Sequence, residues 1–126
     1  MSLIQGELTA RILKSFYTVY NKLGFGFLEK VYENALLLEL RKQGLSCMPQ
    51  QQVKVYYEEV QVGFYMADII VNESIIIEIK ATENLCEQHE YQLINYLRAT
   101  DLEIGILLNF GKSPQFKRKI VTKKSV

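Results

Sequence analysis

Three ionisable side chains lie inside the two most apolar segments of this sequence. Asp68 interrupts segment 64–71, and Glu78 and Lys80 interrupt segment 75–81; both segments are rich in the β-branched residues typical of strands. Burying a charge is costly unless an opposite charge or a metal ion compensates it. A buried ion pair would let Lys80 neutralise one carboxylate but would leave the other uncompensated. The three residues therefore favour a divalent-metal site.

The positions of the two acids restrict the turn between their strands. Side chains alternate between the two faces of a strand, and a slip of one residue exchanges the faces. In a hairpin that joins these strands, Asp68 meets Glu78 on one face only if the connecting loop has an odd number of residues or a bulge intervenes. We therefore predict a three-residue loop at 72–74, where the sequence reads Asn-Glu-Ser.

The segments around these strands predict an α/β protein. Apolar residues recur at helical spacing in two segments before the acids and in one after them, and the other apolar segments are typical of strands. Thr82 or Asn84 is the expected N-terminal cap of the third helix. We predict helices at 3–23, 27–43 and 85–99, a hairpin around 53–62, strands at 64–71, 75–81 and 103–110, and a short edge strand at 116–121. This order predicts a mixed sheet flanked by helices.

Two of the helices carry polar residues that could reach such a site. The predicted buried stripe of the second helix contains Phe27, Leu28, Val31, Tyr32, Ala35, Leu36 and Leu38. Glu29 lies at the margin of this stripe, where a solvated first-turn residue is the more common outcome and a position over the sheet edge is the alternative. His89, Gln92 and Tyr96 share one face of the third helix, which follows the Glu78 strand directly.

Composition limits the class of protein. At 126 residues and 48% hydrophobic content, we expect one domain over 1–126, without a membrane-spanning run or a secretory leader. Two cysteines without metal-ligand spacing favour a reducing cytoplasm. The net charge of +1 is not the strong basic footprint of an obligate nucleic-acid binder. Segment 112–126 is nevertheless basic and free of acids, which fits either contacts with phosphates or a solvated tail.

Five ordered blocks of the chain resemble the PD-(D/E)xK nuclease superfamily and, more narrowly, the small bacterial and archaeal proteins of the GxxExxY family. The blocks are GFLEKVY at 26–32, AD at 67–68, EIK at 78–80, HEYQLINYL at 89–97 and LLNFG at 107–111. Ala67 stands where the superfamily commonly has proline. The resemblance covers the chain from about residue 4 to residue 120, and it implies a restriction-endonuclease-like fold with a central mixed sheet.

The resemblance also implies which residues form the site. The expected active-site set is Glu29, Asp68, Glu78, Lys80 and Gln92. The expected ligands of Mg²⁺, for which Mn²⁺ could substitute, are Asp68, Glu78, the backbone carbonyl of Ile79 and Glu29. Residues expected to support the site are His89, Tyr96 and Tyr32. Residues expected to contact nucleic acid are Lys112, Lys117, Arg118 and Lys119.

The expected activity is metal-dependent hydrolysis of phosphodiester bonds in nucleic acid, with DNA favoured over RNA. A homodimer would double the small phosphate-binding surface, and no membrane partner is expected. The alternative is a catalytically silent domain that binds nucleic acid or another protein, since a fold does not guarantee an activity. The near-neutral charge and the small size favour this alternative, and the intact acid and lysine set favours the enzyme.

Overall fold

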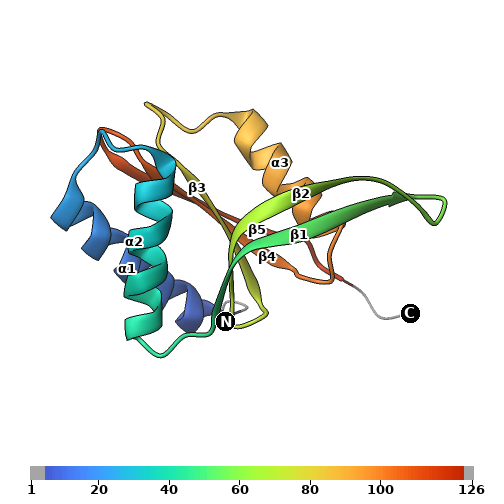
Figure 1. The fold of residues 1–126 in the computed structure, drawn as a ribbon, viewed down its shortest axis with the longest axis horizontal. Coiled ribbons are helices and arrows are strands. Elements are labelled where there is room, and N and C mark those ends of the chain that lie inside the picture. Colours follow the sequence, from blue (N-terminus) through green and yellow to red (C-terminus); the bar gives the residue numbers. More distant parts are fainter. Residues whose placement is uncertain (1–4, 124–126) are drawn as a thin grey trace.

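The computed structural model describes residues 5–123 and arranges them around one mixed sheet (Figure 1). The helices are α1 (Gly6–Leu23), α2 (Glu29–Lys42) and α3 (Glu87–Arg98), and the strands are β1 (Cys47–Tyr57), β2 (Val60–Val71), β3 (Ile75–Lys80), β4 (Ile104–Phe110) and β5 (Pro114–Ile120). Each of these elements overlaps a segment predicted from sequence, although β1 begins at Cys47, before the hairpin predicted around 53–62. The predicted start of the first helix at residue 3 lies outside the described residues.

The five strands lie side by side in their order along the chain, from β1 to β5. Three neighbouring pairs are antiparallel, and β3 and β4 are parallel. Parallel strands need a crossover, and α3 supplies it between β3 and β4. The mixed sheet and the element order confirm the predicted fold class, including the edge strand β5.

The two faces of the sheet have separate cores. On one face α1 and α2 pack against alternate residues of β3 and β4, and on the other face α3 packs against the residues between them. Ile75, Ile77 and Ile79 belong to the α1–α2 side, whereas Ile76 belongs to the α3 side. The alternation of a strand buried on both faces therefore decides which helix each residue of β3 contacts.

Helix α2 is rotated relative to the sequence prediction. Its buried residues are Tyr32, Glu33, Leu36 and Leu40. Leu28 and Leu38, which the prediction placed in the buried stripe, are 81% and 67% exposed. Val31 is exposed as well, and so is Phe27, which lies in the loop before α2. The correction matters for function, since it turns the acid Glu33 toward the sheet.

The turn between β2 and β3 has the predicted length. Ile69 pairs with Ile77 and Val71 with Ile75, so the loop is the three-residue segment 72–74. Asn72 and Glu73 both have positive φ, of 50° and 52°. This register places Asp68 opposite Glu78, and it confirms the odd loop that the metal-site hypothesis required.

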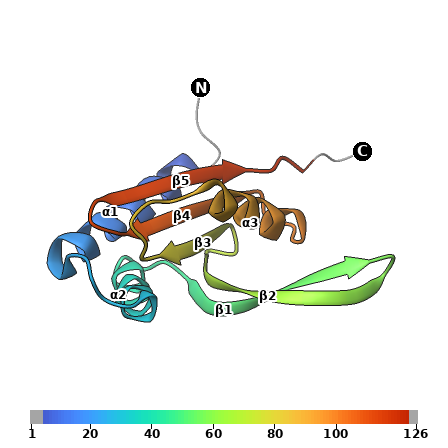
Figure 2. The same cartoon turned by 90° about the horizontal axis from the view of Figure 1, so that it is seen from above.

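The hairpin of β1 and β2 extends beyond the rest of the sheet as an arm (Figure 2). Its turn is Glu58-Glu59, where both residues have positive φ as a two-residue hairpin loop requires. Several large apolar side chains of the arm are exposed, among them Tyr56, Tyr57, Val60, Val62, Phe64 and Tyr65. The arm thus presents apolar surface away from both cores.

The start of α3 differs from the prediction. Neither Thr82 nor Asn84 caps this helix; Cys86 is the N-cap residue. The Nδ1 atom of His89 accepts the backbone N–H of Cys86 at 3.2 Å, which satisfies one donor at the helix start. Among the described helices, none has the length and apolar character needed to cross a membrane.

Candidate active site

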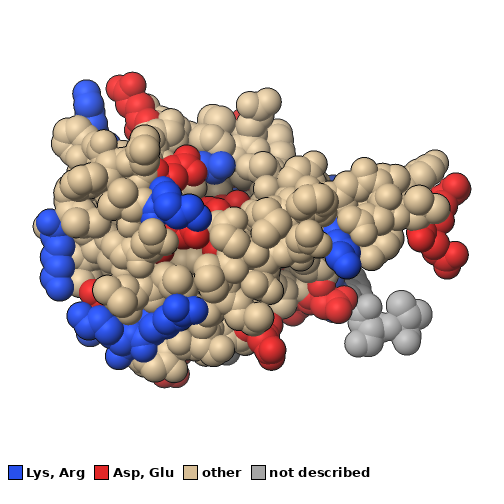
Figure 3. All heavy atoms as spheres, viewed as in Figure 1, with Lys and Arg blue, Asp and Glu red and all other residues tan. Residues whose placement is uncertain are grey.

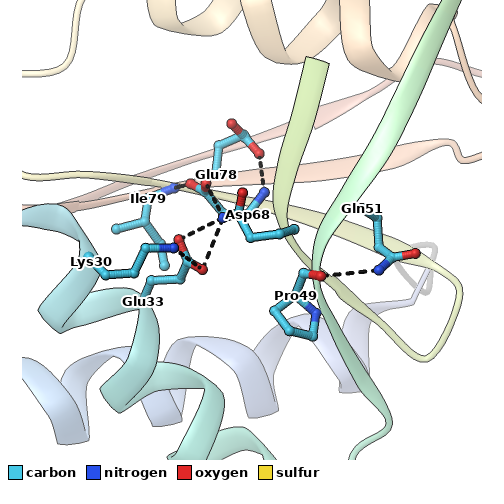
Figure 4. A network of polar contacts seen from close by, with 8 residues as sticks. Lys30, Glu33, Pro49, Gln51, Asp68, Glu78 and Ile79 are labelled. Atoms are coloured by element: carbon cyan, nitrogen blue, oxygen red, sulfur yellow. Dashed lines mark hydrogen bonds and ion pairs between the residues drawn. The ribbon is translucent and has the colours of Figure 1, made fainter. Parts of the chain in front are cut away.

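Asp68 and Glu78 each accept a backbone hydrogen bond from the opposite strand, just beyond the regular pairing of β2 and β3 (Figure 4). The backbone N–H of Asp68 donates to Oε2 of Glu78 at 2.9 Å, and the backbone N–H of Ile79 donates to Oδ2 of Asp68 at 2.8 Å. The regular pairing of the two strands ends one residue earlier, at Ile69 and Ile77. The two carboxylates therefore take the place of the next ladder bonds and are held against the sheet.

A third acid, Glu33 of α2, lies close to this pair. The amide Nε2 of Gln50 donates to both carboxylate oxygens of Glu33 at 3.0 Å and to Oδ1 of Asp68 at 3.4 Å. Lys30 forms an ion pair with Glu33 at 3.1 Å. Figure 4 shows Glu33 and Lys30 on α2 facing Asp68 on the sheet. Helix and sheet thus contribute to one polar cluster.

Gln50 reaches this cluster because β1 is irregular there. It lies between Pro49 and Gln51, which pair with Ile69 and Ala67, but it is itself not paired. Its φ of 50° is unusual for a residue inside a strand. Such a conformation costs about 1–3 kcal/mol and is concentrated at functional sites, where surrounding contacts maintain it. The irregularity directs the Gln50 amide between two carboxylates.

Burial makes the charged form of both central acids unfavourable. Desolvation, with a smaller contribution from Asp68, raises the pKa of Glu78 from 4.5 to about 8. Desolvation is also the main cause that raises the pKa of Asp68, and the nearby Glu33 and Glu29 add to it. Without a cation, Glu78 thus retains its proton at neutral pH. A buried carboxylate pair of this kind is a common feature of functional sites.

Lys80 lies at the end of β3, beside the acids. Its charge lowers the pKa of Glu78, against the larger effect of burial. No ion pair or hydrogen bond of the Lys80 ammonium is found among residues 5–123. Its neighbour on β4 is Asn109, whose side chain exchanges two 2.9 Å hydrogen bonds with the backbone of Thr82. This amide fixes the path of the chain directly after Lys80.

Helix α3 places its polar face beside the acids. Gln92, His89 and Tyr96 line one hollow of about 530 Å³ together with Tyr65 of the arm. Burial, followed by the charges of Glu78 and Asp68, raises the pKa of Tyr96 to about 12, so this hydroxyl stays protonated near the acids. The expected shared face is present. His89 has its Nδ1 engaged at the helix cap, and no hydrogen bond of the Gln92 side chain is found in the described part of the chain.

Two expected residues of the α1–α2 region occupy different environments. Glu29 is exposed at the first turn of α2, and its charge contributes to the raised pKa of Asp68. Tyr32 is fully buried and stacks on Phe110 with ring centroids 4.3 Å apart. Its hydroxyl donates to the carbonyl of Gly24 at 2.7 Å, so Tyr32 closes the loop between the helices and makes no hydrogen bond to the acids.

The four basic residues expected to contact nucleic acid do not form one patch. Lys119 forms an ion pair with Glu90 of α3, and Lys117 also acts on Glu90. Arg118 lies on the opposite face of β5, where it donates to the Thr9 hydroxyl at 3.3 Å. Lys112 follows β4 and lines a hollow of about 350 Å³ with the α1–α2 loop. Their positions separate them into three surroundings.

The oxygen donors at the site suit a hard divalent ion. Mg²⁺ is usually held by one or two carboxylates together with water and substrate phosphates, and Asp68 and Glu78 are such a pair. The carbonyl of Ile79 follows Glu78 directly in β3. Among residues 5–123, no three His, Cys, Asp or Glu side chains converge closely enough to enclose a metal by themselves. The donor set therefore fits a site with two carboxylates rather than a closed cage.

Figure 3 shows acidic atoms in a hollow near the middle of one face, with Lys or Arg atoms beside it. Sequence reasoning missed two residues of the cluster, Glu33 and Gln50. The spacing of Glu33, Leu36 and Leu40 is a helical signal for Glu33. For Gln50 the sequence has no such signal, because its position depends on the irregularity of β1.

The fold is of the restriction-endonuclease-like class, with a mixed sheet that carries its acids at a strand end. It resembles a solved structure, the crystal structure of SSO0001, with a TM-score of 0.58 and 20% sequence identity over 75% of this chain. The match covers 50% of that longer chain. The family model of the PD-(D/E)XK nuclease superfamily matches residues 6–121, so the chain belongs to this superfamily. No significant match to a curated protein was found.

Proposed function

We propose that this protein is a metal-dependent nuclease that hydrolyses phosphodiester bonds, more specifically those of DNA. The observation that carries the proposal is the pair Asp68 and Glu78, held together across two strands with Lys80 at the same strand end. Membership of a nuclease superfamily supports a nucleic-acid substrate. The narrower resemblance to the GxxExxY family, a homodimeric state and a cytoplasmic location belong to the same proposal.

Asp68, Glu78 and the Ile79 carbonyl would hold Mg²⁺, and Mn²⁺ would substitute for it. When bound, the ion supplies positive charge that neutralises the phosphate oxygens of the transition state. Burial raises the pKa of Glu78 to about 8, so a cation that binds there would favour the ionised carboxylate and release its proton. Glu29, or the buried Glu33, would complete the negative surroundings of the ion.

The remaining residues would act on the water and the substrate. The Lys80 ammonium would favour the hydroxide form of the attacking water. Tyr96 would donate a hydrogen bond to a phosphate oxygen, since its pKa of about 12 keeps the hydroxyl protonated. Gln92 would orient the water or the substrate from the same face of α3. These roles use the polar groups on both sides of the acid pair.

A catalytically silent binding domain is the second candidate, and one observation favours it. One oxygen of Asp68 and one of Glu78 already accept backbone hydrogen bonds, so these acids also hold β2 to β3. A protein that had lost its activity could retain both acids for this reason. The two candidates differ in whether Lys80 is needed, because Lys80 has no comparable structural bond among residues 5–123.

Cleavage assays decide between the candidates. Labelled linear, branched and single-stranded DNA and RNA are incubated with the protein in Mg²⁺, in Mn²⁺ or in EDTA. We expect cleavage that EDTA abolishes and that Lys80→Ala or Asp68→Asn lowers by about 100-fold or more. Asp68→Asn keeps an oxygen that accepts the Ile79 N–H. Lys14→Ala, which removes an exposed cation of α1, is the control, and wild-type activity in Lys80→Ala would refute the assigned role.

A further inference from the structure

A groove runs between the projecting arm and helix α3. Its outer part is a hollow of about 560 Å³ between β1, β2 and the end of α3, and its inner part is the hollow of about 530 Å³ beside Gln92. Tyr65 and Asn95 line both hollows, so the two parts are continuous. The inner part includes Tyr96, which is close enough to Glu78 and Asp68 for their charges to act on its pKa.

The lining of the groove combines aromatic rings with positive charges. Tyr56 and Tyr65 of the arm line the outer hollow and are 59% and 48% exposed. Lys54 and Arg98 lie on its two sides, one on β1 and one on α3. Aromatic rings stack on unpaired bases, and cations between them bind the phosphates, which is how sequence-tolerant single-strand binders work. This combination is complementary to an unpaired polynucleotide.

The same groove is poorly suited to a duplex. Duplex binding depends on many phosphate contacts, and the net charge of the whole chain is only +1. The outer hollow offers two cations, and Lys117, Lys119 and Arg118 belong to β5 at the opposite edge of the sheet from β1. Bases that are already stacked and paired also cannot use the exposed tyrosine rings.

We propose that this groove binds a single strand of nucleic acid and leads it past Tyr56 and Tyr65 to Asp68 and Glu78. The proposal rests on the proposed function, because it assigns that site an unpaired strand as substrate. Tyr65 lies three residues before Asp68 on β2, and its ring lies 5.1 Å from that of Tyr96. A base stacked on Tyr65 would therefore lie next to Tyr96, on which the charges of Glu78 and Asp68 act.

Binding is measured without cleavage, on the wild-type protein in EDTA, by fluorescence anisotropy with labelled single-stranded DNA, single-stranded RNA and duplex DNA. We expect a single strand to bind more tightly than the duplex. Tyr56→Ala and Tyr65→Ala should each weaken single-strand binding by about fivefold or more. Tyr65→Phe keeps the ring and should bind like the wild type, which separates stacking from loss of folding.

The arm offers matched controls. Tyr57 and Phe64 neighbour the two groove residues in sequence and are 67% and 52% exposed, but neither lines the groove. Tyr57→Ala and Phe64→Ala should therefore leave single-strand affinity unchanged. Lys54→Ala and Arg98→Ala should each reduce the salt dependence, with the slope of log K against log salt falling by about 0.7.

Several outcomes would overturn the groove assignment. These are equal or tighter duplex binding, equal losses in the groove variants and their controls, or a change in oligomeric mass in Tyr65→Ala with strand affinity retained. The last result would make the groove an interface between two copies of the chain. Single-strand binding in EDTA without cleavage in Mg²⁺ or Mn²⁺ would refute the proposed activity alone. Cleavage that is indifferent to Tyr56 and Tyr65 would refute the groove alone.

Discussion

At the scale of single residues, the site is a group of acids that basic side chains neutralise only in part. Asp68 and Glu78 each accept a hydrogen bond from a backbone N–H of the sheet. Glu33 and Asp68 both accept hydrogen bonds from the Gln50 amide. Burial, with smaller contributions from the charges of Asp68 and Glu33, raises the pKa of Glu78 to about 8. A bound cation would lower the cost of ionising these carboxylates. The pKa values of Asp68 and Glu78 in the metal-free protein therefore depend on which other acids lie close to them.

We predict that Glu33 matters more than Glu29 for the site. Glu33→Gln should reduce Mn²⁺ affinity or cleavage by about 10- to 100-fold, because Glu33 is buried and positions Gln50 beside Asp68. Glu29→Gln should have a smaller effect, since Glu29 is exposed. Titration with Mn²⁺ and cleavage rates test both variants. A larger loss in Glu29→Gln would show that the helix contributes its first-turn acid instead.

The pKa of Glu78 predicts how the metal-free protein responds to pH. Between 4.5 and about 8 the folded protein binds more protons than the unfolded chain, so the free energy of unfolding should fall as pH rises through this range. The total fall should be on the order of a few kcal/mol. Urea unfolding in EDTA at several pH values measures it.

Glu78→Gln should flatten this dependence, because the amide does not titrate. Glu73→Gln, in the exposed turn between β2 and β3, is the control and should retain the wild-type slope. A wild-type stability that rises between pH 5 and pH 8 would contradict the prediction. Added Mg²⁺ should oppose the loss at high pH, since a ligand that binds only the folded state stabilises it.

At the scale of secondary-structure elements, the end of β3 is held by its neighbours. Asn109 of β4 bonds to both backbone groups of Thr82 and, through Nδ2, to Gln115 of β5 at 3.0 Å. Gly111 allows the close approach, since a Cβ there would lie 2.3 Å from the Thr82 carbonyl oxygen. The segment that carries Lys80 is therefore anchored on one side by β4.

Gly111→Ala should destabilise the protein by about 1–3 kcal/mol, because the new methyl group would displace the chain after β3. Gly63→Ala in β2 is the control, since a Cβ there meets no atom within 4 Å. Urea unfolding compares the two variants. Equal stability of Gly111→Ala and the wild type would show that the approach to Thr82 can relax without cost.

The elements also show what the sequence could predict. The parity of strand positions was sufficient to predict the odd loop at 72–74, and helical spacing predicted α1 and α3 closely. The orientation of α2 was wrong, because the exposed apolar residues Phe27 and Leu28 precede the helix and were counted in its buried stripe. Local hydrophobic pattern cannot reveal where a helix leaves the sheet. For the same reason Glu33 was overlooked.

At the scale of the whole molecule, function depends on surfaces that no single segment defines. The basic segment at the end of the chain was expected either to contact phosphates or to be a solvated tail, and β-strand alternation divides its Lys119 and Arg118 between two faces of the sheet. The groove arises only when the arm folds beside α3. Its residues come from the β1–β2 hairpin and from α3, which are separated in sequence by β3, so neither composition nor spacing indicated it.

Asp68 and Glu78 have a structural role besides the proposed catalytic one, and this has a consequence for related proteins. Each carboxylate accepts a backbone hydrogen bond between β2 and β3. A related protein that had lost its activity would therefore still be destabilised by replacing either acid. The Lys80 ammonium makes no comparable structural bond among residues 5–123. Among homologues, retention of this lysine should therefore indicate an active enzyme more reliably than retention of the two acids.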